Sequence, residues 1–422
     1  MAEKEREESL VYNLLSKDEK LKNGIHNESI VDIVDSILLM AINYGASDIH
    51  FEQSQNDLRI RYRIDGILYD QTAIKKELGA AILSRLKILS NLDIAEKRVP
   101  QDGKFRVRIC KKSENIQNDN NLIDMRISTF PTIYGEKLVM RILDKSQNNI
   151  ELNKLGMDEF TLSEFYKLID RPYGFFLITG PTGSGKTTTL YSILSHLNDG
   201  EKNIITMEDP VEYNLDGIVQ SQINEKAGFN FHTGLRSILR QDPDVIMIGE
   251  IRDKETAKIA IEAALTGHLV FSTLHTNDTV SAVTRLIDMG VDSFLINAAL
   301  SGVLSQRLVR SLCNSCKKED LITEQEENNL KNININNFKL NKINRPCGCN
   351  NCFDLGYKGR IGIFELLKID DEIRDLISAK NSTKQIKDFL IKKNMKFMKD
   401  DALKKVDNGQ TSFEEFFKAI IH

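Results

Sequence analysis

The clearest chemical pattern in the chain is a glycine-rich loop at residues 180–187, which reads Gly-Pro-Thr-Gly-Ser-Gly-Lys-Thr. It lies between an apolar run and a helix-like stretch, so every position of the phosphate-binding pattern G-x-x-x-x-G-K-T is filled in a strand–loop–helix context. The glycines let backbone N–H groups close around phosphate oxygens, Lys186 reaches the β- and γ-phosphates, and Thr187 offers its hydroxyl to Mg²⁺. The loop therefore predicts binding of a nucleoside triphosphate. The predicted contacts are Gly180, Pro181, Thr182, Gly183, Ser184, Gly185, Lys186, Thr187 and Thr188.

Carboxylates follow two further apolar runs. Glu208, Asp209 and Glu212 stand at the end of one run, and Glu250 ends the other. Ligands of α/β folds bind at the ends of strands, where a carboxylate can hold the water shell of Mg²⁺ or orient the attacking water. The first group is alternatively an ordinary polar loop.

Two histidines, His268 and His275, flank a third apolar run. A single histidine is more often structural than functional. A pair around one strand of a nucleotide-binding protein is equally consistent with a structural role and with phosphate sensing, and both remain open at this point.

Five of the six cysteines lie within forty residues of one another, in two C-x-x-C pairs with one extra cysteine beside them. Such a cluster favours metal over disulfides in an intracellular chain, and each pair can supply two thiolates to one tetrahedral Zn²⁺. The predicted ligands are Cys313, Cys316, Cys349 and Cys352. Cys347 is an alternative ligand, free or redox-active thiols are the alternative function, and Cys110 is expected to be a small buried hydrophobe.

Composition narrows the class of protein. Hydrophobic residues make up 41% of the 422 residues, which is enough to bury real cores. A net charge of −4 argues against a broadly basic nucleic-acid surface. The first residues are charged throughout, which argues against a secretory signal, and no apolar run approaches the roughly 18–20 residues that span a bilayer. We expect a cytoplasmic protein that a partner holds at the membrane.

The remaining pattern predicts the elements that position these residues. A helix capped by Asn27 or Ser29, alternating strands and an Asp65-Gly66 hairpin turn indicate a small α+β domain. Apolar strands that alternate with helices then indicate a mainly parallel sheet with helices on both faces, its strands expected at 174–179, 203–207, 245–248 and 269–273. The predicted organisation is a polar tail or frayed helix at 1–27, an α+β domain at 28–145, a linker at 146–158 and a nucleotide-binding α/β domain at 159–422, which includes a cysteine-bearing insertion at 311–356, a solvated loop at 331–345 and a helical part at 370–422.

These motifs together resemble the ATPases of type II secretion and type IV pilus assembly. The segments that carry the resemblance, besides the glycine-rich loop, are 205–213 (aspartate box), 241–253 (Walker B region), 266–277 (histidine box), 46–52, 92–103 and 126–141. The resemblance covers about residues 28–422, and the combination is far more specific than any one motif.

The resemblance implies a RecA-like P-loop ATPase core preceded by a PAS-like domain, a homohexamer, and a zinc-binding insertion. It further implies that Arg126 and Arg141 reach the nucleotide from the PAS-like domain, with Arg236, Arg240 and Arg360 as weaker candidates. In this view the catalytic residues are Glu250, Glu208, Lys186, Arg126, Arg141 and His275. Glu250 and Glu208 share metal positioning and water activation, and either could be the base.

The function implied is an ATP- and Mg²⁺-dependent hydrolase at the inner face of the cell membrane. It would drive an inner-membrane platform protein to extrude pilin-like subunits, with no direct contact to nucleic acid. Many family members carry an additional N-terminal docking domain, whereas here about 27 residues precede the PAS-like domain, so a shorter helix or the core itself is expected to dock. The alternatives are a pilus retraction motor, against which the cysteine pairs argue, a DNA-uptake pseudopilus motor, a nucleic-acid translocase and a non-enzymatic scaffold.

Overall fold

The computed structural model describes residues 11–15, 29–110, 122–144, 150–333, 340, 342–379 and 381–421. The chain divides into two compact units, Met1–Asn148 and Asn149–His422, and each is described by itself. Within the described residues no helix is both long and apolar enough to cross a membrane.

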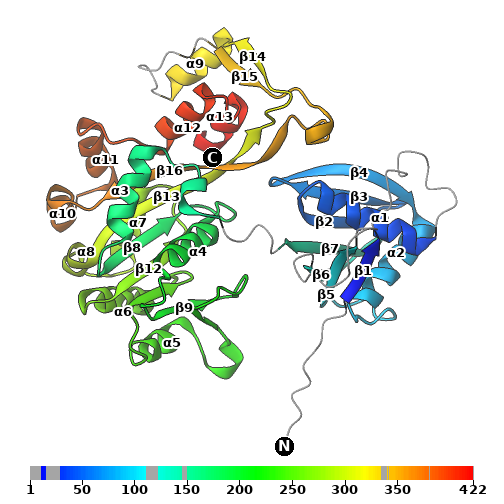
Figure 1. The fold of residues 1–422 in the computed structure, drawn as a ribbon, viewed down its shortest axis with the longest axis horizontal. Coiled ribbons are helices and arrows are strands. Elements are labelled where there is room, and N and C mark those ends of the chain that lie inside the picture. The colour runs from blue at the N-terminus through cyan, green and yellow to red at the C-terminus, as the bar shows by residue number, and fades with distance from the viewer. Residues whose placement is uncertain are drawn as a thin grey trace, which may run out of the picture. The chain divides into compact units, whose positions relative to one another are not determined.

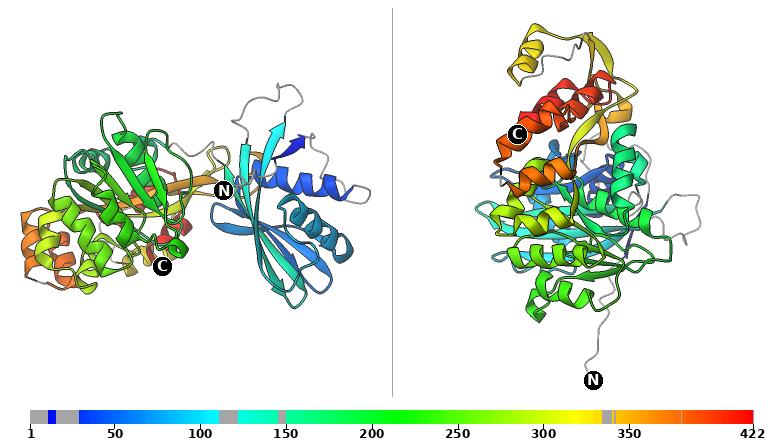
Figure 2. Two further views of the ribbon diagram at one scale, coloured as in Figure 1. Left: turned by 90° about the horizontal axis from the view of Figure 1, so that it is seen from below. Right: turned by 90° about the vertical axis from the view of Figure 1, so that its left-hand side faces the viewer.

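The first unit is a seven-stranded sheet in the order β1-β5-β6-β7-β2-β3-β4, with two helices against one face (Figure 2). Its elements are β1 (Val11–Leu15), α1 (Ile30–Asn43), β2 (Ala46–Gln53), β3 (Asp57–Ile64), β4 (Ile67–Lys75), α2 (Lys76–Leu89), β5 (Gln101–Cys110), β6 (Leu122–Thr132) and β7 (Gly135–Asp144). Ser29 caps α1 through its side chain, and Asp65 and Gly66 both adopt positive φ between β3 and β4, as the hairpin turn requires.

One strand of this unit differs from the prediction. Residues 11–15 lie in the stretch expected to be a tail or frayed helix, yet they form β1, which pairs in parallel with β5. Leu14 is fully buried by this pairing. The partner strand follows about ninety residues later in the chain, so no local pattern could have indicated it. Residues 1–10 and 16–28, and the side chain of Cys110, lie outside the described part.

The second unit is built on a seven-stranded sheet in the order β10-β9-β11-β12-β8-β13-β16 (Figure 1). Every strand pair in it is parallel except β13 with β16. Its strands are β8 (Gly174–Thr179), β9 (Ile204–Glu208), β10 (Val219–Gln222), β11 (Val245–Ile248), β12 (Leu269–Leu274), β13 (Leu300–Leu312) and β16 (Tyr357–Lys368), with a separate ribbon of β14 (Lys318–Leu321) and β15 (Lys342–Arg345). Its helices of at least seven residues are α3 (Glu159–Ile169), α4 (Lys186–Leu197), α5 (Phe231–Ile238), α6 (Lys254–Leu265), α7 (Thr279–Asp288), α8 (Ser293–Ala299), α9 (Glu324–Asn332), α10 (Asp371–Ser378), α11 (Thr383–Lys392), α12 (Met398–Asp407) and α13 (Phe413–Ile421).

Helices cover both faces of this sheet. Phe176 and Ile178 of β8 pack with α3 and α4 in one core, whereas Phe175 and Leu177 pack with α5 to α8, α10 and α11 in the other. A third core joins the far ends of β13 and β16 to α12 and α13. Alternate residues of one strand therefore serve opposite layers, as a sheet buried on both faces demands. The predicted mixed α/β class with a mainly parallel sheet is confirmed.

Several segments for which no strand was predicted contain regular structure. Strands β10, β13 and β16 were not predicted, and in β13 polar residues such as Ser305 and Gln306 become buried only through tertiary partners. Residues 342–345 of the expected solvated loop form β15. In the expected linker, Leu152 is buried in the core and Asp158 caps α3, while residues 145–149 lie outside the described part.

Candidate functional site

The glycine-rich loop connects β8 to α4 and is held in shape by β13. Gly180 has φ +148°, and a Cβ there would lie 2.3 Å from the carbonyl oxygen of Gln306. Gln306 also donates from Nε2 to the Ser184 carbonyl oxygen at 2.8 Å, and it accepts from the Thr189 hydroxyl at 2.8 Å. The loop is thus fixed by a buried amide from a neighbouring strand. Nothing in the local pattern pointed to Gln306, because β13 itself was not recognised.

Lys186 is held over this loop. Its Nζ donates to the carbonyl oxygens of Gly180 at 2.8 Å and Pro181 at 3.1 Å. Burial lowers the pKa of Lys186, and the negative charge of Glu250 opposes that shift. Thr187, next in sequence, is exposed. An ammonium group and a hydroxyl therefore stand at the start of α4, where the helix dipole also favours an anion.

Three predicted side chains lie at the same edge of the sheet as the loop. Strands β8, β12, β11 and β9 are parallel neighbours, so their carboxyl ends coincide. Glu208 ends β9, Glu250 comes two residues after β11, and His275 comes directly after β12. His275 Nε2 lies 3.2 Å from one carboxylate oxygen of Glu250, and Arg252 binds the other.

The two glutamates differ in their surroundings. Glu208 is 3% exposed and accepts hydrogen bonds from Tyr191, from the Thr206 hydroxyl at 2.6 Å and from Gln220 Nε2 at 3.2 Å. Burial and the hydrogen bond to Glu208 raise the pKa of Tyr191. The side chain of Glu250 is 19% exposed. Glu208 is therefore a fixed internal acceptor, and Glu250 is the carboxylate that a substrate can approach.

Other candidates lie elsewhere. His268 lies directly before β12, at the opposite end of that strand from His275. Its Nδ1 lies 2.9 Å from the Ala263 carbonyl oxygen, so this histidine has a structural role. Arg236 and Arg240 are exposed and bond to one another, from Arg240 Nη1 to the Arg236 carbonyl oxygen at 2.8 Å. Arg360 is exposed near the start of β16.

Arg126 and Arg141 lie in the first unit on neighbouring strands, directly opposite one another. With Lys104 they line a cavity of about 840 Å³. Arg141 Nε lies 3.1 Å from Asp48 Oδ1, and Asp48 is buried. Asp48 and Asp102 line the same hollow, so three cations and two carboxylates surround it, and an anionic group would bind there beside the arginines.

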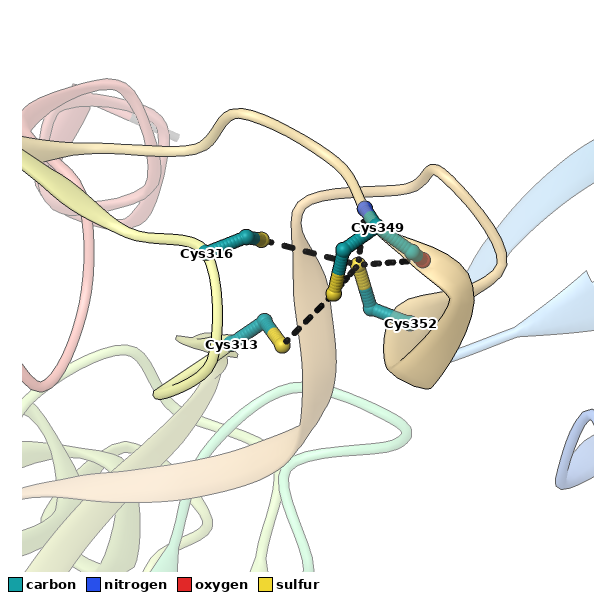
Figure 3. Close-up of side chains that lie close together, drawn as sticks. All are labelled: Cys313, Cys316, Cys349 and Cys352. Carbon is teal, nitrogen blue, oxygen red and sulfur yellow. Dashed lines mark hydrogen bonds between the residues drawn. The ribbon is translucent and has the colours of Figure 1, made fainter.

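The two cysteine pairs form one cluster (Figure 3). Cys313 and Cys316 follow β13, while Cys349 and Cys352 precede β16, and these strands are antiparallel neighbours. The sulfur atoms of Cys313 and Cys349 are 3.9 Å apart, and those of Cys316 and Cys352 are 3.7 Å apart. All four lie within 4.8 Å of one another. A tetrahedral site with Zn–S bonds of about 2.3 Å needs sulfur separations of about 3.8 Å, so this donor set fits zinc.

Cys347 is not part of this cluster. It is exposed, and its sulfur contacts the Arg345 carbonyl oxygen at 3.9 Å. The backbone N–H groups of Cys349 and Gly356 point at the Cys352 sulfur at 3.3 Å, an arrangement that stabilises thiolate ligands.

Comparison with known proteins places this geometry in a family. A model of the family described as Type II/IV secretion system protein matches residues 24–418. The type II secretion system ATPase E of Vibrio cholerae is 46% identical over 404 residues, which cover 96% of this chain and 78% of that protein. The type IV pilus assembly ATPase PilB of Myxococcus xanthus is 45% identical over 399 residues, which cover 94% and 69%.

A solved structure agrees. The pilus retraction motor PilT with bound ADP matches with a TM-score of 0.58 and 26% identity, over 91% of this chain and 96% of that one. Matches over nearly the whole chain, on a parallel sheet that gathers a P-loop and acidic side chains at one edge, establish that this chain is a RecA-like ATP hydrolase of the Type II/IV secretion system protein family.

Proposed function

We propose that this chain is the homohexameric motor that powers assembly of a type IV pilus or a type II secretion pseudopilus from the cytoplasmic face of the membrane. The observation that carries the hydrolytic part of the proposal is the convergence of Lys186, Glu250 and His275 at one sheet edge. Relatives that match most of the chain are named for these two systems. ATP hydrolysis would move the two units relative to one another and drive an inner-membrane platform protein that extrudes pilin-like subunits.

In this proposal each of these residues has a separate role in binding or hydrolysis of ATP. Lys186 and the backbone of residues 180–188 bind the phosphates, and Thr187 binds the Mg²⁺ that accompanies ATP and neutralises its charge. Glu250 activates the attacking water, because it is the accessible carboxylate and His275 orients it. Glu208 holds the metal's water shell from its fixed position. The four-cysteine cluster holds a structural zinc.

Arg126 and Arg141 are proposed to contact the γ-phosphate from the first unit. Replacing either with Ala should lower the rate of ATP hydrolysis about 10- to 100-fold, the cost of losing one charge-assisted hydrogen bond. Thermal melting should barely change in Arg126→Ala, because Arg126 is exposed, whereas Arg141→Ala should lower the melting temperature, because it removes a partner of the buried Asp48. Phosphate release and melting curves of the full chain measure both effects.

The matched control is Arg106→Ala. Arg106 alternates onto the same face of the sheet and pairs with Asp124 at 2.8 Å, but it does not line the cavity. Its hydrolysis rate should stay near wild type. Unchanged kinetics in both test variants would return Arg126 and Arg141 to the role of surface residues.

Deletion of the gene tests the biological role. We expect loss of a surface filament or of a secreted product, imaged by electron microscopy and assayed in the culture medium. The Lys186→Ala protein expressed beside wild type should be dominant negative, because hexamers mix subunits and inactive sites stall the ring. Excess filaments in the deletion strain would instead identify a retraction motor. Intact filaments with defective DNA movement would identify a DNA translocase.

A further inference from the structure

A buried carboxylate lies between the nucleotide edge and the C-terminal helices. Glu365 on β16 is 5% exposed. One of its oxygens accepts from the backbone N–H of Thr279 at 3.1 Å and from the Thr279 hydroxyl at 2.5 Å. The other accepts from the backbone N–H of Met398 at 3.2 Å. A single side chain thus binds the first residues of two helices, α7 and α12.

The first of these helices begins at the nucleotide edge. His275, which contacts Glu250, starts the short segment 275–278 that leads into α7. The same segment is held from β13, where the Ser305 hydroxyl donates to the Asn277 carbonyl oxygen at 3.3 Å. Ser305 stands directly opposite Glu365 in the sheet, and its neighbour Gln306 holds the glycine-rich loop. The carboxylate therefore lies one residue pair away from the contacts that shape the nucleotide site.

The second helix belongs to the C-terminal part. Helix α12 packs on β16 and on α13. Its first residue, Met398, is buried, and so is Lys405 near its end. Asp278 makes a parallel link to this part of the chain, because its carboxylate lies 2.8 Å from Nζ of Lys387 on α11. The segment after β12 is thus tied to the C-terminal helices at two points, and Glu365 is the buried one.

Keeping a carboxylate at this position is costly unless it is fully bonded. Burial raises the pKa of Glu365, and the hydrogen bonds from Thr279 and Met398 oppose that shift. Two helix N-termini add favourable dipoles to a negative charge. A hydrophobic side chain would pack here without this desolvation cost, but it could not bridge two helix starts.

We infer that Glu365 is a positioning residue that couples the nucleotide-facing segment 275–279 to helices α12 and α13. A shift of that segment when nucleotide binds or is hydrolysed would move the N-terminus of α7, and the shared carboxylate would transmit the displacement to α12. The inference rests on the proposed binding of ATP at the glycine-rich loop, and it adds the route by which that event reaches the C-terminal helices.

The hydrogen bonds that Glu365 accepts from Thr279 and from Met398 form a bridge between α7 and α12. Two variants break this bridge in different ways. Glu365→Gln keeps the size of the side chain but leaves one acceptor oxygen in place of two. Met398→Pro removes the N–H that donates to Glu365 together with the packing of the Met398 side chain. Proline is tolerated at the first position of a helix, and Phe397 before it already has the extended backbone that proline requires, with φ −89° and ψ 167°. Met398→Ala is the matched control, since it loses the same packing but keeps the N–H.

Hydrogen–deuterium exchange of the full chain, with and without a non-hydrolysable ATP analogue, reads the coupling. In wild type and Met398→Ala, the analogue should change exchange at residues 180–188, at 275–279 and in α12. In Glu365→Gln and Met398→Pro, the change at 180–188 should persist and the change in α12 should be lost. The rate of ATP hydrolysis in these two variants should fall about 2- to 30-fold, the usual range for residues that couple two sites.

The outcomes separate the inference from the proposed function. A response in α12 that survives in both bridge variants would overturn the inference. So would a wild-type chain that responds at residues 180–188 and not in α12. A wild-type chain with no response at residues 180–188 would contradict ATP binding at the loop, and with it both proposals.

Discussion

Lys186→Ala is expected to abolish productive ATP binding and, with it, ATP hydrolysis. The substitution removes the only side-chain cation that the glycine-rich loop places at the start of α4. The β- and γ-phosphates therefore lose the positive charge that would bind them. The substitution also removes the two hydrogen bonds from Lys186 to the loop, but the contacts of Gln306 and of the glycine backbone that hold the loop remain. Titration with a fluorescent ATP analogue and a phosphate-release assay measure the two losses.

Glu250→Gln separates binding from chemistry at the same site. This variant should still bind the analogue, but its rate of hydrolysis should fall about 10²- to 10⁴-fold, the contribution of a positioned general base. Glu255→Gln, an exposed glutamate on α6, is the control and should hydrolyse ATP like wild type. Wild-type turnover by Glu250→Gln would assign the base elsewhere, with Glu208 as the next candidate. Tight ATP binding by Lys186→Ala would contradict the role given to the lysine.

Loss of the metal site should have the largest effect on stability. We expect one zinc per chain, and Cys352→Ser should lose it, since this buried sulfur lies within 3.8 Å of two other ligands. Structural zinc contributes about 10–16 kcal/mol in small zinc-finger peptides, whereas a whole domain is stable by about 5–15 kcal/mol. The segments around both cysteine pairs should therefore unfold. Elemental analysis and hydrogen exchange over residues 313–357 provide the measurements.

The unfolding should spread to the C-terminal helices through three contacts. The backbone N–H of Leu312 donates to the Gln410 carbonyl oxygen at 2.9 Å. Lys317 Nζ donates to the Gly409 carbonyl oxygen at 2.8 Å. Arg310 forms a buried ion pair with Glu415 of α13 at 2.8 Å. Cys347→Ser is the control, because this exposed cysteine lies outside the cluster, and it should retain full zinc. Protein purified without chelator that contains no zinc would contradict the assignment.

The local sequence pattern was sufficient to predict those parts of the site and of the fold that are encoded by residues close together in the chain. The strand–loop–helix around residues 180–187 was predicted directly from its sequence motif, and β8 and β11 have the predicted bounds. Continuous apolar runs mark strands buried on both faces, and Asp65-Gly66 marks a hairpin. Each of these signals is complete within about ten residues.

Tertiary structure decided which segments far apart in the chain contact one another. The polar residues within β13, which do not alternate with its apolar residues, gave no strand signal, yet this strand aligns the cysteine pairs, supplies Gln306 to the glycine-rich loop and pairs with the strand that carries Glu365. The difference between Glu208 and Glu250 also appears only in three dimensions, because Tyr191 and Gln220 reach Glu208 from separate elements.

Residue type and spacing did not distinguish the two histidines of 266–277, although the family resemblance singled out His275, and the fold places them at opposite ends of β12. The sequence by itself therefore identified the residue types proposed to bind phosphate and metal, since these depend on short spacing. Which of them meet, and how deeply each is buried, depended on strand pairing between segments as far apart in the chain as Phe175 and Leu300, a nonlocal property that no short pattern contains.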